Sequence, residues 1–451
     1  MLRRPMEREE HIRQRGLIRL AGDREALRLR IQLLLSGIGR GRHIDLTEVF
    51  HPTDTSSFRL ALYIALDLIL ALAVLAVALL GVRYVLIAAV PFLFNPIFHE
   101  FRRTRYEHEI ARVNYCVSLA LALKKMRKWA DRDLDVYLKD AYSHLDRMKP
   151  ILRAGPVMSG LNSDPFQAAV MNFFLLDLIS FEILKKRLNR YHDHFLAVHE
   201  AVGRLDAAVA AASFRQSMTT WCEPEIEFDA ERPFIRAEGV VHPLLEGAVP
   251  NDLSLEGSLL ITGSNASGKS TFLRASALCA LLAETLCTCP CGTYRGSFFR
   301  IYTSMALSDD LMSGESYFIA EIRSIKRVLD AQKEEGFILC VLDEVLRGTN
   351  TVERIAASAE ILSALAGKNT LCLAATHDQE LCGLTSGRYQ AAHFEETVTD
   401  EGVAFDYRLK PGPARSRNAI LLLKVMGFDQ SIADAAHERA DAYMKTGKWT
   451  K

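Results

Sequence analysis

Two long apolar runs stand out near the N-terminus of the chain. Leu60 to Leu80 is almost unbroken leucine, alanine, valine and isoleucine, interrupted by one acid, Asp67, and it shows no polar face. About twenty such residues match the ~30 Å hydrocarbon core of a bilayer, which favours a transmembrane helix over a buried helix of a soluble protein. The second run, Tyr84 to Phe98, contains Pro91 and Pro96 and is short for a full span, which leaves a tilted helix or a re-entrant segment.

The distribution of basic residues around these runs favours a hairpin. Residues 1–59 are rich in arginine, Arg102-Arg103-Thr104-Arg105 follows the second run, and only Arg83 separates the two runs. Because positive residues stay on the cytoplasmic side, we predict a transmembrane hairpin over residues 60–98 in contact with membrane lipid, with both flanks in the cytoplasm. Residues 1–59 are expected to form a charged helical segment, whose arginines are either a solvated helix face or a contact to anionic lipid.

The rest of the chain shows two further patterns. In residues 101–224 apolar positions recur at helical spacing, as at Leu119, Ala122, Leu123 and Met126, which predicts an all-α region. From residue 225 short β-like runs begin, punctuated by Pro224, Pro233, Pro243 and Pro250. This pattern predicts an α/β domain over residues 225–440, followed by a tail at 441–451.

Composition adds little to this picture. The 451 residues have a formal net charge of zero, so any surface that binds nucleic acid must be a local patch. The nine cysteines form no paired framework, which favours a reducing compartment. The cluster Cys287-Thr-Cys289-Pro-Cys291 could hold a soft metal, but no second Cys or His pair stands nearby in sequence, so we expect reduced, packed thiols.

One stretch of the α/β region carries a clear chemical pattern. The apolar run Leu259-Leu260-Ile261 leads into G-x-x-x-x-G-K-S and then into a helix-compatible run from Phe272 to Leu286. A strand, a glycine-rich turn and a helix form the context of a P-loop, in which backbone N–H groups surround phosphate oxygens. Lys269 would reach the β- and γ-phosphates of ATP, and Ser270 would bind Mg²⁺. The candidate nucleotide-binding residues are Gly263, Ser264, Asn265, Ala266, Ser267, Gly268, Lys269, Ser270 and Thr271.

Two later strands would complete such a site. The apolar run from Gly336 ends in Asp343 and Glu344, and this pattern predicts a magnesium ligand followed by a residue that polarises the attacking water. The run from Leu371 ends in Thr376 and His377. A histidine at the carboxyl end of a parallel strand lies where ligands bind, so His377 is a candidate sensor of the γ-phosphate.

These motifs together resemble the ATPase domain of the MutS family of DNA mismatch-repair proteins. The resemblance is strong from about residue 225 to 435 and weaker over residues 101–224. Its pieces stand in the family's order: His242-Pro243 and Asn251, the P-loop, Ser308-Asp309-Asp310-Leu311, Gly314-Glu315-Ser316-Tyr317-Phe318-Ile319-Ala320-Glu321, Asp343-Glu344-Val345-Leu346-Arg347-Gly348-Thr349-Asn350 and Thr376-His377.

The resemblance implies a composite site in a homodimer. In MutS proteins two ATPase domains pair, and Ser316 matches the signature serine that reaches the partner's γ-phosphate. Duplex DNA is an implied partner, although the chain offers no room before residue 101 for the family's mismatch-recognition domain. Ala248 stands where the family has the aromatic residue that stacks on adenine, which puts that contact in doubt.

We therefore expect an α/β P-loop NTPase (ABC-like) domain that follows an all-α core or lever region and an N-terminal transmembrane hairpin. The expected function is that of a membrane-anchored, MutS-like ATPase with a cytoplasmic ATPase domain that acts on DNA as a dimer. An ATP-dependent switch that acts on a protein partner without DNA is the alternative. An ABC-type transporter is disfavoured because two short apolar runs make a poor transport pathway.

Overall fold

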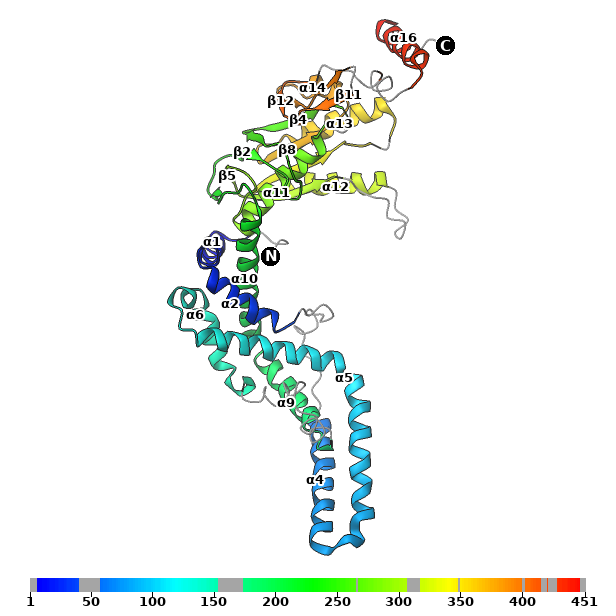
Figure 1. Cartoon of the computed structure of the whole chain (residues 1–451). Helices are drawn as coiled ribbons and strands as arrows, with labels where there is room; N and C mark the ends of the chain where they lie inside the picture. Colours follow the sequence, from blue (N-terminus) through cyan, green and yellow to red (C-terminus); the bar gives the residue numbers. More distant parts are fainter. Residues whose placement is uncertain are drawn as a thin grey trace. The chain divides into compact units, whose positions relative to one another are not determined.

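The computed structural model describes residues 6–39, 57–152, 173–264, 267–305, 317–347, 349–399, 402–414, 420 and 428–446. The chain divides into two compact units (Figure 1). The helical unit comprises Gly16–Ser213, and the α/β unit comprises Phe214–Lys451 together with Met1–Arg15.

The helical unit contains the elements α1 to α10, of which α1 begins and α10 ends in residues of the α/β unit. Apolar side chains at helical spacing form its core, and the predicted stripe Leu119, Ala122, Leu123 and Met126 is buried. The elements are α1 (Arg8–Asp23), α2 (Glu25–Ser36), α4 (Ser57–Leu80), η1 (Val82–Tyr84), α5 (Val85–Arg127), α6 (Arg132–Arg147), α9 (Leu176–Arg190) and α10 (His192–Ser217).

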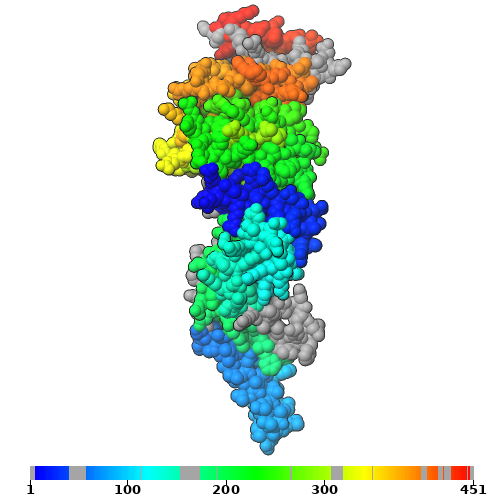
Figure 2. Space-filling view, turned by 90° about the vertical axis from the view of Figure 1, so that its left-hand side faces the viewer, coloured from blue at the N-terminus to red at the C-terminus, as the bar shows by residue number. Residues whose placement is uncertain are grey.

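Helices α4 and α5 lie side by side and are joined by the short turn η1 (Figure 1). Two stretches, Ser57–Leu80 and Val82–Ala111, are long and apolar enough to cross a membrane, and only 11% of the most apolar part of each is buried in the protein. In Figure 2 this pair, in light blue, stands out from the rest of its unit. Helix α5 continues through Pro91 and Pro96 to Arg127, so its apolar part is longer than the fifteen-residue run in the sequence suggested.

The α/β unit is built around a six-stranded sheet of order β12-β9-β4-β8-β7-β6, beside a four-stranded sheet of order β1-β5-β2-β3. The structure confirms the predicted order of a helical region followed by an α/β domain. The strands are β1 (Glu225–Glu227), β2 (Ile235–Val240), β3 (Asn251–Leu255), β4 (Ser258–Thr262), β5 (Thr293–Ser297), β6 (Phe299–Ser304), β7 (Phe337–Asp343), β8 (Thr370–Ala375), β9 (Tyr389–His393), β10 (Glu396–Thr399), β11 (Gly402–Phe405) and β12 (Lys410–Pro411). The helices are α11 (Lys269–Leu286), α12 (Tyr317–Ala331), α13 (Thr351–Leu365), α14 (Glu380–Leu384) and α16 (Gln430–Thr446).

The central strands of the large sheet are covered on both faces. Leu259 and Ile261 pack with α11 residues such as Leu273, whereas Leu260 packs with the residues of α12 and α13 on the other face, including Leu362. Continuous apolar runs are typical of parallel strands that are buried on both sides. Strands β4, β8 and β7 are parallel neighbours, so their carboxyl ends meet at one edge of the sheet.

A buried acid ties the end of α11 to the start of β6. The Oε1 atom of Glu284 accepts a hydrogen bond from the backbone N–H of Phe299 at 2.6 Å, and the side chain is 5% exposed. Burial raises the pKa of Glu284 from its ordinary value of 4.5 to about 8. Below a pH of about 8 the folded protein therefore holds Glu284 mainly in its protonated form.

We expect Glu284 to make folding stability fall as pH rises. Because its folded pKa lies above the unfolded value, the folded state binds the extra proton, and stability is lost between pH 4.5 and about 8. Glu284→Gln keeps the acceptor for Phe299 without the charge. The variant should gain a few kcal/mol over the wild type at the upper end of this range, at ~1.4 kcal/mol per pKa unit, and nothing at the lower end. Denaturant midpoints of both proteins across this range measure the difference, and parallel pH profiles would contradict the assignment.

Candidate functional site

The turn between β4 and α11 depends on two glycines with left-handed backbone conformations. Gly263 has φ = +141° and Gly268 has φ = +110°. A Cβ atom on Gly263 would lie 2.4 Å from the carbonyl oxygen of Phe394, closer than any side chain tolerates. Residues with a Cβ rarely adopt these conformations, so the spacing of the two glycines sets the shape of the loop.

Lys269 begins α11 and folds back over this loop. Its Nζ donates hydrogen bonds to the carbonyl oxygens of Gly263 at 2.8 Å and Ser264 at 2.6 Å. Burial lowers the pKa of Lys269, while the carboxylates of Glu344 and Asp343 act in the opposite direction. The ammonium group is thus a buried cation held by two carbonyl oxygens, and the oxygens of an anionic ligand could replace them.

The end of β7 presents a carboxylate suited to a cation. The Oδ1 atom of Asp343 is buried and has no hydrogen-bond partner among the described residues. Ser270, in the first turn of α11, lines the adjoining cavity. A carboxylate and a hydroxyl oxygen are hard ligands of the kind that Mg²⁺ prefers, so this pair of residues fits the predicted magnesium site.

Glu344 follows Asp343 in a strained backbone conformation. Its φ is +58°, and its backbone N–H donates to the carbonyl oxygen of Ala375 on β8 at 3.0 Å. This turn directs the carboxylate of Glu344 to His377, whose Nε2 lies 2.8 Å from Oε1, and to Arg347, whose Nε lies 3.1 Å from Oε2. Strain of this kind persists only where the surrounding structure holds it.

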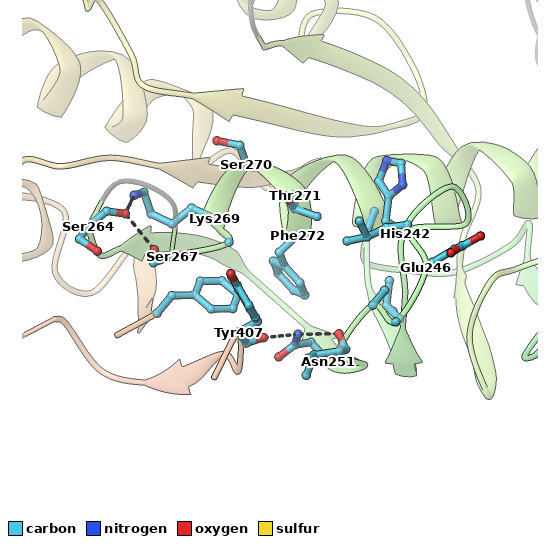
Figure 3. Close-up of a pocket in the computed structure, with 18 of the residues that line it drawn as sticks. His242, Glu246, Asn251, Ser264, Ser267, Lys269, Ser270, Thr271, Phe272 and Tyr407 are labelled. Atoms are coloured by element: carbon cyan, nitrogen blue, oxygen red, sulfur yellow. Dashed lines mark hydrogen bonds between the residues drawn. The ribbon is translucent and has the colours of Figure 1, made fainter. Parts of the chain in front are cut away.

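The predicted side chains surround a cavity of about 490 Å³ (Figure 3). Ser264 and Lys269 lie at one end of the cavity in this view, and His242 and Glu246 lie at the other. The predicted residues that line it are Ser264, Ser267, Gly268, Lys269, Ser270, Thr271, Glu344 and His377. Gly263 and Asp343 adjoin it without lining it, and Asn265, Ala266 and Ser316 lie outside the described residues.

Tyr407 is a cavity residue that the sequence reasoning missed. It lines the cavity together with Ala248 and stacks on Phe405, with ring centroids 5.7 Å apart. The side chain of Asn251 holds its segment, because Nδ2 donates to the carbonyl oxygen of Tyr407 at 2.9 Å and Oδ1 accepts from the N–H of Leu409 at 2.7 Å. An aromatic ring is thus present in the cavity although position 248 is alanine.

The loop after β7 is tied to α12 and α13. Glu321, on α12, accepts a hydrogen bond from the backbone N–H of Leu346 at 2.7 Å, and burial raises the pKa of this glutamate. Asn350 caps α13 by accepting from the N–H of Val352 at 3.0 Å. The helix that follows the Ser316 segment therefore contacts the same loop that positions Glu344.

Comparison with known proteins identifies this domain. Residues 259–444 match the family model of MutS domain V. The DNA mismatch repair protein MutS of Natronomonas pharaonis is 35% identical over 251 residues, which cover 53% of this chain and 28% of that protein. The corresponding protein of Thermus thermophilus is 33% identical over 263 residues, covering 57% and 31%. DNA mismatch repair protein MutS 2 of Halobacterium salinarum is 32% identical over 263 residues, covering 54% and 30%.

The α/β unit thus resembles MutS domain V over residues 259–444, and the similar proteins are DNA mismatch repair proteins MutS, as the motifs led us to expect. The matched region spans less than one third of the length of each of these curated relatives.

We expect Gly263→Ala to destabilise the α/β unit. The new methyl group would meet the carbonyl oxygen of Phe394 at 2.4 Å in a backbone conformation that alanine disfavours, at a cost of at least ~1–3 kcal/mol. Gly257→Ala is the matched control, because a Cβ there meets nothing within 4 Å. The midpoint of urea denaturation should fall for the first variant alone. Equal midpoints would show that the loop accommodates a side chain at position 263.

Proposed function

We propose that the α/β unit binds ATP with Mg²⁺ in this cavity and hydrolyses it. The observation that carries the proposal is the convergence of Lys269, Glu344 and His377 on one cavity next to the unsatisfied carboxylate of Asp343. Each of these residue types has a role in phosphoryl transfer, and the match to MutS domain V supports the same reading.

In this proposal the loop Gly263–Thr271 surrounds the phosphate chain with backbone N–H groups, at the N-terminus of α11. Lys269 exchanges its two carbonyl partners for phosphate oxygens. Ser270 and Asp343 would hold Mg²⁺, which when bound neutralises phosphate charge. Tyr407 offers an aromatic face for the base, taking the place of the aromatic residue that position 248 lacks.

Glu344 and His377 act on the attacking water. The carboxylate of Glu344 orients the water and accepts its proton, and His377, 2.8 Å away, holds that carboxylate in place. Glu344 has a positive φ and lines the cavity, so its carboxylate would face the γ-phosphate of a bound ATP. Loss of the γ-phosphate would therefore change the contacts of both residues.

Glu344→Gln should bind ATP but stall in hydrolysis. A general base contributes about 10²–10⁴-fold, so phosphate release by the full chain in detergent should fall at least ~100-fold while ATP affinity changes little. Glu353→Gln, an exposed acid on α13, is the control and should turn over normally. Equal turnover in Glu344→Gln and the control would remove Glu344 from the assigned role.

We further propose that two copies pair through their ATPase domains and that Ser316 of each copy reaches the γ-phosphate held by the other. This pair would act on duplex DNA, since the similar proteins are named DNA mismatch repair proteins. Closure on ATP would move the helices that lead into the α/β unit. An ATP-dependent switch that acts on a protein partner is the alternative.

Binding of DNA to the full chain tests this part of the proposal. We expect the affinity for plain duplex to fall steeply as salt concentration rises and to depend on ATP, because phosphate contacts release counterions. A mismatched duplex in the same series measures base recognition separately. Absence of binding to both duplexes at low salt, with and without ATP, would contradict the DNA role and favour the protein partner.

We also propose that α4 and the first half of α5 anchor the chain in a membrane, with the ATPase domain in the cytoplasm. Their apolar side chains are open to the surroundings, as at Leu72, Leu79 and Leu86, which are 63%, 74% and 82% exposed. A contiguous apolar surface of this kind is costly in water and stable in lipid. The arginines that flank the pair favour a cytoplasmic location for both flanks.

Charges placed in this pair should release the chain from membranes. The wild type should stay in the membrane fraction after alkaline extraction. The double variant Leu72→Arg with Leu75→Arg should lose that retention, since each arginine costs ~2.5–3.5 kcal/mol at the bilayer centre. Val136→Arg, at an apolar position of α6 that is 72% exposed, is the control and should stay bound. A wild-type chain found in the soluble fraction would refute the anchor.

A further inference from the structure

Four cysteines from three separate segments meet inside the α/β unit. Cys222 follows α10, Cys279 lies in α11, and Cys289 and Cys291 lie in the turn after α11. The last three are at most 1% exposed, and Cys222 is half-buried. The sequence marked the run with Cys289 and Cys291 as a possible soft-metal site but gave no sign of Cys222, which stands 69 residues before Cys291.

Three of these sulfur atoms lie close enough together to bind one metal ion, and the sulfur of Cys279 adjoins one of them. Sγ of Cys291 lies 3.6 Å from Sγ of Cys222 and 3.7 Å from Sγ of Cys279. The sulfurs of Cys222, Cys289 and Cys291 all lie within 4.8 Å of one another, and Sγ of Cys289 lies 3.7 Å from the carbonyl oxygen of Cys279. Zinc–sulfur bonds of ~2.3 Å in a tetrahedron set the sulfurs about 3.8 Å apart. A disulfide would need about 2.05 Å.

The backbone around these sulfurs holds them without a metal. Cys222 and Cys289 form an antiparallel bridge in which each N–H donates to the other's carbonyl oxygen at 2.9 Å. The turn Cys289-Pro290-Cys291 is fixed to β2 and the residue after it, because Gly292 N–H donates to the carbonyl oxygen of Glu238 at 2.8 Å and Val241 N–H donates to that of Pro290 at 3.0 Å. Ligands on such fixed elements lose little freedom when an ion binds.

Cys287 shows that burial of a thiol in this turn does not by itself bring it to the cluster. It belongs to the same run as Cys289 and Cys291 and is also buried. Its sulfur points to the carbonyl oxygen of His11, at 3.7 Å, whereas the sulfurs of Cys222 and Cys279 both point to that of Cys291. The cluster is therefore a specific set of four thiols.

We propose that Cys222, Cys279, Cys289 and Cys291 bind one zinc ion. Four thiolates in a closed, buried tetrahedron are the ligand set of a structural zinc site, with no open position for a substrate. The ion would join the chain segment after α10 to α11 and to the turn that follows it. Cys279 stands ten residues after Lys269 on α11, about 15 Å along the helix at 1.5 Å per residue. The site would thus fix the helix whose other end forms the glycine-rich loop.

Metal content and cobalt spectra of the full chain in detergent test this proposal. Protein purified without metal-affinity steps should contain about one zinc ion per chain by elemental analysis. Exchange for Co²⁺ should give the strong sulfur-to-cobalt charge-transfer absorption and the visible bands of tetrahedral thiolate coordination. Cys279→Ser and Cys291→Ser should lower the zinc content at least ~10-fold, whereas Cys287→Ser, the matched control in the same turn, should keep it.

Two results on the wild type would overturn the proposal, whether or not the serine variants fold. The first is a chain that contains no zinc, gives no thiolate spectrum with Co²⁺, and shows all four cysteines as free thiols when they are counted after unfolding. The four cysteines would then be buried thiols without a metal. The second is a chain whose mass and thiol count show a disulfide within the cluster. Equal loss of zinc in Cys287→Ser would also contradict the assignment of ligands.

Discussion

The parallel register of β4, β8 and β7 is the constraint on which the candidate site depends. Ile261 pairs with Ala375, and Ala375 pairs with Asp343, so the glycine-rich loop, His377 and Glu344 all begin at one edge of the sheet. The backbone hydrogen bond from Glu344 to Ala375 extends this register into the loop after β7. A slip of one residue would turn these side chains to the opposite face of the sheet.

Charge within the cavity is arranged around a buried lysine. Lys269 has two carbonyl partners and faces the carboxylates of Asp343 and Glu344, so the local field suits a ligand that brings both phosphate oxygens and a cation. His377 and Arg347 hold the carboxylate of Glu344 between them. Helix α12, through the contact of Glu321 with Leu346, reaches the same loop from the other side. The cavity and α12 are therefore linked through one loop.

Local sequence patterns predicted the strands and turns that are determined by residues close together in the sequence. The apolar runs predicted β4, β7 and β8, because a strand that is buried on both faces needs apolar residues throughout. The glycine spacing predicted the turn before α11, because a positive φ favours glycine. Tyr407 escaped prediction because its link to Asn251 joins residues 156 apart. Cys222 escaped it for the same reason, because it stands 69 residues before Cys291, whereas Cys289 and Cys291 lay in a run that the sequence marked as a possible soft-metal site. The packing of residues 6–15 on the α/β unit, where His11 contacts the carbonyl oxygen of Ala283 at 3.1 Å, left no pattern either.

The central claim is that this cavity holds the phosphates of ATP through Lys269. Equilibrium binding of ATP with Mg²⁺ to the full chain tests it most directly, with Lys269→Met compared to Lys326→Met, which removes an exposed lysine of α12. A charge-assisted hydrogen bond is worth about 1.5–3 kcal/mol, so the account predicts that Lys269→Met weakens binding about 10–100-fold while Lys326→Met binds like the wild type. Equal ATP affinity in the wild type and both variants, or no binding to the wild type, would contradict it.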